Sequence, residues 1–129
     1  MAAMVLDASA ALALILQEPG AEQVIDALRS GASMSAVNVA EVAARLHQEG
    51  WDQTEVALVF DELDIQILPF DADTALLSGS YRVPTRHLGL GLGDRACLAT
   101  ARIAASPALT ADRTWVNVDI EGVEVCCIR

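Results

Sequence analysis

The stretch "MVLDASAALALIL", residues 4–16, decides the fold, because in it a short apolar run meets a small-residue, leucine-rich segment at Asp7. The run before Asp7 has the length of a buried strand, and the segment after it predicts a helix. Burying a lone carboxylate costs several kcal/mol unless the carboxylate is paired, hydrogen-bonded or bound to a metal. Asp7 therefore needs a partner.

Length and composition predict one globular domain over residues 1–129. The chain is 53% hydrophobic and 20% charged, and only 4% of its residues are aromatic, which leaves the core to Ala, Val, Leu and Ile. The longest apolar or small stretch, residues 8–16, is about half of the ~20 residues that cross a bilayer. The N-terminus has no basic region of the kind that begins a secretory signal. We therefore expect a cytoplasmic protein with no membrane association.

The charge is distributed unevenly around a formal net value of -10. Residues 1–81 contain thirteen acids and two arginines, whereas residues 82–129 contain five acids and six arginines. Two interpretations of the second segment stay open: ordinary solvated charges, or a rim of guanidinium groups that contacts phosphates. Five of its arginines lie close together in the sequence, namely Arg82, Arg86, Arg95, Arg102 and Arg113.

Helix-like and strand-like patterns alternate along the chain. Apolar residues recur at helical spacing over residues 21–28, 39–46 and 56–63, and the last of these helices opens with a capping box of Asp52 and Glu55. Short apolar runs predict strands at residues 4–6, 33–36, 65–68, 108–111 and 123–128. This alternation predicts an α/β domain with a largely parallel sheet covered by helices on both faces.

The glycine-rich segment "RVPTRHLGLGLG", residues 82–93, predicts a mobile surface loop. Its glycines do not have the GxGxxG spacing, and no predicted strand immediately precedes them. A dinucleotide-binding or P-loop site is therefore excluded.

Four carboxylates are predicted to meet at one edge of the sheet. Asp7 and Asp112 follow predicted strands, Glu41 falls in the first turn of the helix after "SMSAVN", and Asp94 opens the helix after the glycine loop. In an open parallel sheet, ligands bind beyond the carboxyl ends of the strands. We therefore expect one site that contains all four acids.

Each acid also has a local structural interpretation, and these alternatives stay open. Asp7 and Asp94 fit helix N-caps, Asp112 fits a turn, and Glu41 has capping-box spacing from Asn38. Four carboxylates in one crevice would nevertheless repel one another, so a cation should lie among them. A set of oxygen ligands without His or Cys selects Mg²⁺ or Mn²⁺. The open coordination positions of such an ion suit a phosphodiester, which predicts hydrolysis of a nucleic-acid backbone.

Four segments, "VLDASAALALIL", "SAVNVAEV", "GLGLGDRACLATA" and "LTADRTW", resemble in order and spacing the PIN-domain nucleases, specifically the VapC-type toxins of bacterial toxin–antitoxin pairs. The resemblance implies a three-layer α/β/α PIN-like fold with a five-stranded, mainly parallel sheet. It also implies endoribonuclease activity that depends on Mg²⁺ or Mn²⁺. The catalytic and metal-binding residues it implies are Asp7, Glu41, Asp94 and Asp112, with Ser9 and Thr110 supporting them through hydroxyl hydrogen bonds.

The same resemblance implies a homodimer, an RNA substrate and a small cognate antitoxin. Arg86, Arg95 and Arg113 are candidate RNA contacts, and Asn117 and Asp119 are both candidates for a further position in the site. The main alternative is a non-catalytic PIN-like module that binds RNA or protein. A phosphoacceptor receiver domain would need a lysine, and the chain has none.

Overall fold

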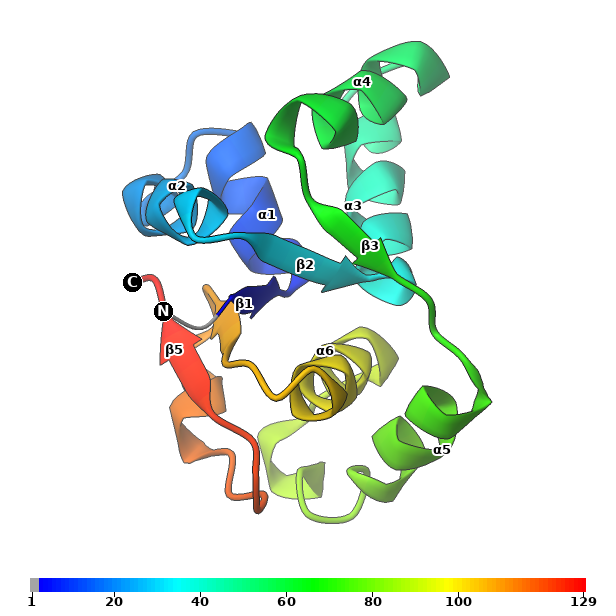
Figure 1. The fold of residues 1–129 in the computed structure, drawn as a ribbon, viewed down its shortest axis with the longest axis vertical. Helices are drawn as coiled ribbons and strands as arrows, with labels where there is room; N and C mark the ends of the chain where they lie inside the picture. The colour runs from blue at the N-terminus through cyan, green and yellow to red at the C-terminus, as the bar shows by residue number, and fades with distance from the viewer. Residues whose placement is uncertain (1–2) are drawn as a thin grey trace.

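The computed structural model describes residues 3–129 and contains a five-stranded, all-parallel sheet (Figure 1). The strand order β3-β2-β1-β4-β5 places β1 at the centre. The predicted fold class is thereby confirmed. The strands are β1 Met4–Leu6, β2 Ala32–Ser35, β3 Gln66–Leu68, β4 Ala108–Thr110 and β5 Val125–Cys127.

Helices cover both faces of the sheet, with α1 to α4 on one side and α6, flanked by α5, on the other (Figure 1). No helix among residues 3–129 combines the length and the apolar character needed to cross a membrane. The helices are α1 Ala8–Ile15, α2 Ala21–Arg29, α3 Ala36–Gln48, α4 Gln53–Leu63, α5 Ala72–Ser80 and α6 Leu92–Ile103, with single 3₁₀ segments η1 Arg86–Leu88 and η2 Arg113–Asn117.

The central strand shows why the sheet needs helices on both sides. Successive side chains of a strand point to opposite faces, and both Val5 and Leu6 are completely buried. Leu6 packs in the core beneath α1 to α4, whereas Val5 packs in the second core with Leu98 and Trp115. A strand buried on both faces reads as a continuous apolar run, which is the pattern of a parallel sheet.

The three helices predicted from periodicity are present as α2, α3 and α4. The capping box of α4 forms as expected: Glu55 N–H donates to Asp52 across 2.8 Å, and Asp52 N–H donates to Glu55 across 2.9 Å. Ile25 departs from the pattern, since its side chain is 37% exposed although its spacing predicts a buried position.

The middle of the chain differs from the sequence-based expectation in two respects. The sequence patterns did not predict helix α5, and residues 82–93, although mostly exposed at the surface and rich in turns, are not irregular throughout. They contain η1 and the first two residues of α6, and they bury Leu90 and the hydroxyl of Thr85, which donates to the Tyr81 carbonyl across 2.6 Å. These buried anchors explain why the segment is structured despite its glycines.

Candidate metal centre

Asp7 is the most deeply buried of the four acids, with 4% of its surface exposed. It is the N-cap of α1, and its carboxylate accepts the Ala10 N–H across 2.8 Å. The Thr110 hydroxyl donates to Oδ2 across 2.6 Å, and the Ser9 hydroxyl lies 2.7 Å from Oδ1 and 2.9 Å from Oδ2. Asp7 is therefore a helix N-cap, as its position suggested, but the cap uses only the Ala10 N–H and does not involve the two hydroxyl donors.

These hydrogen bonds do not fully compensate for the burial of Asp7. Burial raises the pKa of Asp7 from 3.8 to about 6, although hydrogen bonds from Thr110, Ala10 and Ser9 act in the opposite direction. The negative charge of Asp94 raises this pKa further. The ionised form of Asp7 thus has no salt-bridge partner among residues 3–129.

The two hydroxyls also bind backbone groups that follow β4. The Ser9 oxygen accepts the Ala111 N–H across 2.9 Å, and the Thr110 oxygen accepts the Asp112 N–H across 3.0 Å. The Asp7 N–H donates to the Leu109 carbonyl across 3.0 Å, which continues the pairing of β1 with β4 beyond the strand. The sheet therefore fixes where Asp7 lies relative to Asp112.

Asp94 lies at the third residue of α6, not at the residue that opens the helix, because α6 begins two residues earlier than predicted. Its carboxylate accepts the Gly91 N–H across 3.1 Å. Burial raises the pKa of Asp94, and the charges of Glu41 and Asp112 raise it further, while Gly91 and Arg95 lower it. The charge of Asp94 therefore interacts unfavourably with the charges of Glu41, Asp112 and Asp7.

Glu41 lies in the second turn of α3, since Ser35 is the N-cap of that helix. The predicted capping box with Asn38 is wrong. Instead, the Asn38 side-chain nitrogen donates to Glu41 Oε1 across 2.9 Å and to the Gly93 carbonyl across 2.9 Å. Glu41 lies so close to Gly93 that a Cβ atom at that position would overlap its carboxylate.

Asp112 is the N-cap of η2, as its interpretation as a turn residue had suggested. Its Oδ1 atom accepts both the backbone N–H and the hydroxyl of Thr114, each across 2.9 Å. The residue is exposed to solvent. Oδ2 has no hydrogen bond among residues 3–129 and can face a ligand.

The four acids lack basic partners within the described chain. Across residues 3–129 the salt bridges are Arg29–Asp26 and Arg45–Glu49, and neither involves these acids. No group of three or more His, Cys, Asp or Glu side chains in this range is close enough to enclose a metal ion. Mg²⁺ keeps several waters and usually takes one or two carboxylates. The acids therefore form no closed protein cage, and their oxygen donors would suit only an ion that keeps several waters. The expected single site of all four acids stays a prediction.

The three arginines singled out by the sequence lie near the acids along the chain. Arg86 in η1 and Arg113 in η2 are exposed, whereas Arg95 in α6 is half-buried and donates to the Gly91 carbonyl across 3.3 Å. Asn117 and Asp119, the candidates for a further position, are both exposed.

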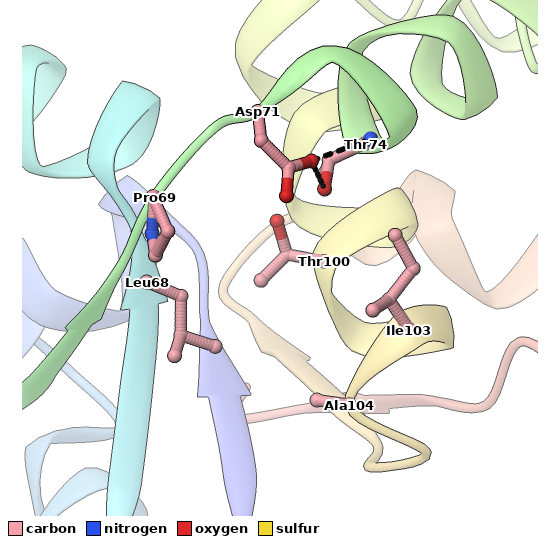
Figure 2. A pocket seen from close by; sticks show the side chains of 7 residues that line it. All are labelled: Leu68, Pro69, Asp71, Thr74, Thr100, Ile103 and Ala104. Carbon is pink, nitrogen blue, oxygen red and sulfur yellow. Dashed lines mark hydrogen bonds between the residues drawn. The ribbon is translucent and has the colours of Figure 1, made fainter.

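A separate pocket of about 250 Å³ lies between the end of β3, α5 and α6 (Figure 2). Its walls are mostly apolar, and its one acid, Asp71, caps α5 by accepting the Thr74 N–H and hydroxyl across 2.9 and 2.7 Å. None of the four candidate ligands lines this pocket. It is therefore distinct from the carboxylate site.

Asn38 and Gly93 are the residues of the site whose roles sequence reasoning missed. The three-residue spacing between Asn38 and Glu41 was visible, but it suggested a helix cap. Gly93 precedes Asp94 in a glycine-rich segment, a composition that predicts a mobile loop. Only the packing of α3 against α6 shows that both residues contact Glu41.

Comparison with known proteins gives a consistent result. A family model described as the PIN domain matches residues 4–121. Ribonuclease VapC42 of Mycobacterium tuberculosis is 31% identical over 128 residues, which span 91% of this chain and 96% of that protein. Solved structures with the same fold include the following two. The sarcin–ricin loop cleaving toxin VapC20 of M. tuberculosis has a TM-score of 0.74 at 16% identity, covering 94% of this chain and 98% of that one. A toxin–antitoxin complex from Klebsiella pneumoniae has a TM-score of 0.65 at 25% identity, covering 93% and 94%.

Proposed function

The chain belongs to the PIN-domain family, and we propose that it is a divalent-metal-dependent endoribonuclease that acts as the toxin of a toxin–antitoxin pair. The observation that carries this proposal is that the charge of Asp94 repels the charges of Asp7, Glu41 and Asp112, while none of the four acids has a salt-bridge partner among residues 3–129. A relative 31% identical over most of the chain is named a ribonuclease, which supports the same activity here.

The proposed ligands of Mg²⁺ or Mn²⁺ are Asp7, Glu41, Asp94 and Asp112, some binding the ion directly and others through its waters. When bound, the ion supplies Lewis-acid polarisation of a phosphodiester and neutralises the charge that develops during hydrolysis. Asp7 provides a fixed anionic oxygen, because Thr110, Ser9 and the Ala10 N–H hold its carboxylate in one orientation.

The remaining acids complete the site from different elements. Asp94 is held by the Gly91 N–H at the start of α6, and Asp112 keeps one oxygen free while Thr114 binds the other. Because both side chains are fixed through a single oxygen, the second oxygen of each can face the ion or the substrate. Burial and neighbouring carboxylates raise the pKa values of Asp7 and Asp94. Such shifts are expected at an acidic site whose charge a bound cation would balance.

Arginines supply the positive charge that RNA needs. The net charge of -10 disfavours non-specific binding of phosphates, so local arginines must hold the backbone. We assign this role to Arg86, Arg95 and Arg113, which lie on the three segments that carry or flank Asp94 and Asp112.

Further proposals concern partners and organisation. The fold shared with a chain of a toxin–antitoxin complex supports a small antitoxin as the partner of this chain. We also propose a homodimer of single-domain subunits that acts in the cytoplasm, where cellular RNA is accessible.

The test is cleavage of total bacterial RNA by the purified chain with Mn²⁺, with Mg²⁺ and with EDTA. The wild type should produce discrete fragments with either ion and none with EDTA, and Asp94→Asn should produce none under any condition. Equal fragmentation by wild type and Asp94→Asn would point to a contaminating nuclease and favour the non-catalytic binding module.

A further inference from the structure

Asn38 joins two elements that carry the acids. It lies in the first turn of α3, and its side chain is 1% exposed. Its single side-chain nitrogen donates both of its protons, one to Glu41 Oε1 and one to the Gly93 carbonyl at the start of α6, each across 2.9 Å. One uncharged group therefore ties Glu41 of α3 to the backbone residue that precedes Asp94.

Glu41 depends on this contact for its orientation. The residue is exposed, and Asn38 is the one hydrogen-bond donor to its carboxylate among residues 3–129. A glutamate side chain loses considerable rotamer freedom when it is fixed. Without the amide, nothing in the described structure would select the conformation in which Glu41 points toward α6.

Gly93 provides the space for that conformation. The three atoms nearest to a Cβ built at Gly93 are the two oxygens and the carboxyl carbon of Glu41, all closer than any real Cβ contact. The Glu41 carboxylate thus lies directly over the first turn of α6, beside the position of Asp94. Any side chain at residue 93 would push it away.

Fold stability alone does not account for an asparagine at position 38. Its side-chain oxygen is buried and has no hydrogen-bond partner among the described residues, and an unsatisfied buried acceptor is destabilising. An apolar side chain of similar size would pack without that penalty. A neutral donor has the further property that it orients Glu41 while leaving its full negative charge available.

We propose that Asn38 is a positioning residue, which together with the space at Gly93 holds the Glu41 carboxylate beside Asp94 so that both face one divalent cation. This inference rests on the proposed function for the identity of the ion. Groups that orient metal ligands typically change metal affinity 10- to 100-fold when they are removed.

The first test measures Mn²⁺ binding to the full chain by electron paramagnetic resonance, together with thermal unfolding. Asn38→Ala and Gly93→Ala should each weaken Mn²⁺ binding by about 10-fold or more. Leu46→Ala, which removes a buried side chain from the same helix, should lower Tm and leave Mn²⁺ affinity unchanged in the folded protein. Wild-type affinity in Asn38→Ala and Gly93→Ala would overturn the proposal.

Gly93→Ala separates positioning from stability. The atoms it displaces belong to the end of a flexible, exposed side chain, and alanine favours a helix more than glycine does. Tm should therefore not fall while Mn²⁺ binding weakens, and a purely structural role would make the two change together. In a Glu41→Ala background, Asn38→Ala should cause no further loss of Mn²⁺ affinity, because Asn38 acts through Glu41.

A second readout needs neither metal nor activity. In the metal-free protein, nuclear magnetic resonance of ¹³C-labelled Glu41 should show one dominant side-chain rotamer in the wild type and averaging in Asn38→Ala. A wild type that neither binds Mn²⁺ nor cleaves RNA, combined with this averaging, would refute the proposed function while upholding the positioning of Glu41. One unchanged rotamer in Asn38→Ala would refute the positioning, whatever the activity.

Discussion

The Thr110 hydroxyl lies 2.6 Å from Asp7 Oδ2, although the two residues are 103 positions apart in the sequence. The contact exists because β1 and β4 are neighbours at the centre of the sheet and both end at the same edge. It joins the first acid of the chain to the segment that carries the last one. The parallel pairing of the two strands therefore places the segment that carries Asp112 beside Asp7.

Thr110→Val removes this hydroxyl and keeps the shape of the side chain. Because the Thr110 hydrogen bond lowers the pKa of Asp7, its loss should raise that pKa further above about 6 and weaken Mn²⁺ binding at pH 7 by about 10-fold. Carboxyl ¹³C titration and calorimetric Mn²⁺ binding measure the two effects. Thr54→Val, at an exposed position of α4, is the matched control and should change neither quantity.

Asp7 should make the metal-free protein less stable as pH rises from about 4 to about 6. Its pKa is raised from 3.8 in the unfolded chain to about 6 in the folded one, so the folded state binds more protons in this interval. The free energy of unfolding should fall by about 3 kcal/mol across it from this group. Below the unfolded pKa the contribution is fully present, and above the folded pKa it is lost.

Asp7→Asn isolates that contribution, because asparagine keeps the N-cap and cannot ionise. Urea unfolding in EDTA measures the free energy of unfolding of both proteins. The value for Asp7→Asn should increase relative to the wild-type value as pH rises from 4 to 6, and the difference between the two values should be constant above pH 7. A difference that does not change with pH would show that Asp7 titrates normally in the folded state.

Divalent cations should stabilise the wild type by mass action. At a concentration of 100 times Kd, Mg²⁺ or Mn²⁺ should add about 2.7 kcal/mol to the free energy of unfolding, and EDTA should reverse the effect. Asp94→Asn should lose most of this gain, since it removes a charged ligand and keeps the shape of the side chain. Asp61→Asn, an exposed acid on α4, is the control and should retain the gain.

Arg86→Gln should weaken binding of single-stranded RNA and reduce its salt dependence. Loss of one phosphate contact should lower the slope of log K against log salt by about 0.7. Binding is measured by fluorescence anisotropy in the Asp94→Asn background, which prevents cleavage. Arg29→Gln removes an exposed arginine that pairs with Asp26 on α2 and should leave the slope unchanged. An unchanged slope for Arg86→Gln would make Arg86 an ordinary surface residue.

The sequence alone was sufficient to predict the parallel sheet and the positions of Asp7 and Asp112 at its edge. Apolar runs such as residues 4–6 are buried and therefore predict parallel strands, and Asp7 and Asp112 follow the ends of two of those strands. The sequence did not predict helix α5 because its apolar residues do not form one buried face. Leu76, for example, is 76% exposed, and the helix ends with Gly79 and Ser80. Local composition there resembles a loop.

The details of the site depended on contacts between distant segments. Spacing alone could not show whether Asn38 caps α3 or donates to Glu41, since the two roles place the same residues three apart. The choice is made by Ser35, which occupies the cap, and by Gly93, which lies 55 residues away. The spacing of the sequence also could not show the role of Gly93, which lacks a side chain and so leaves room for the carboxylate of Glu41 from another helix.

The central claim is tested most directly by mapping RNA 5′ ends across the transcriptome after brief induction of the wild type and of Asp94→Asn in antitoxin-free cells. The account predicts new 5′ ends at defined positions with the wild type and none with Asp94→Asn, both proteins being soluble and equally abundant. Identical end profiles for the two proteins would contradict a ribonuclease built on these carboxylates.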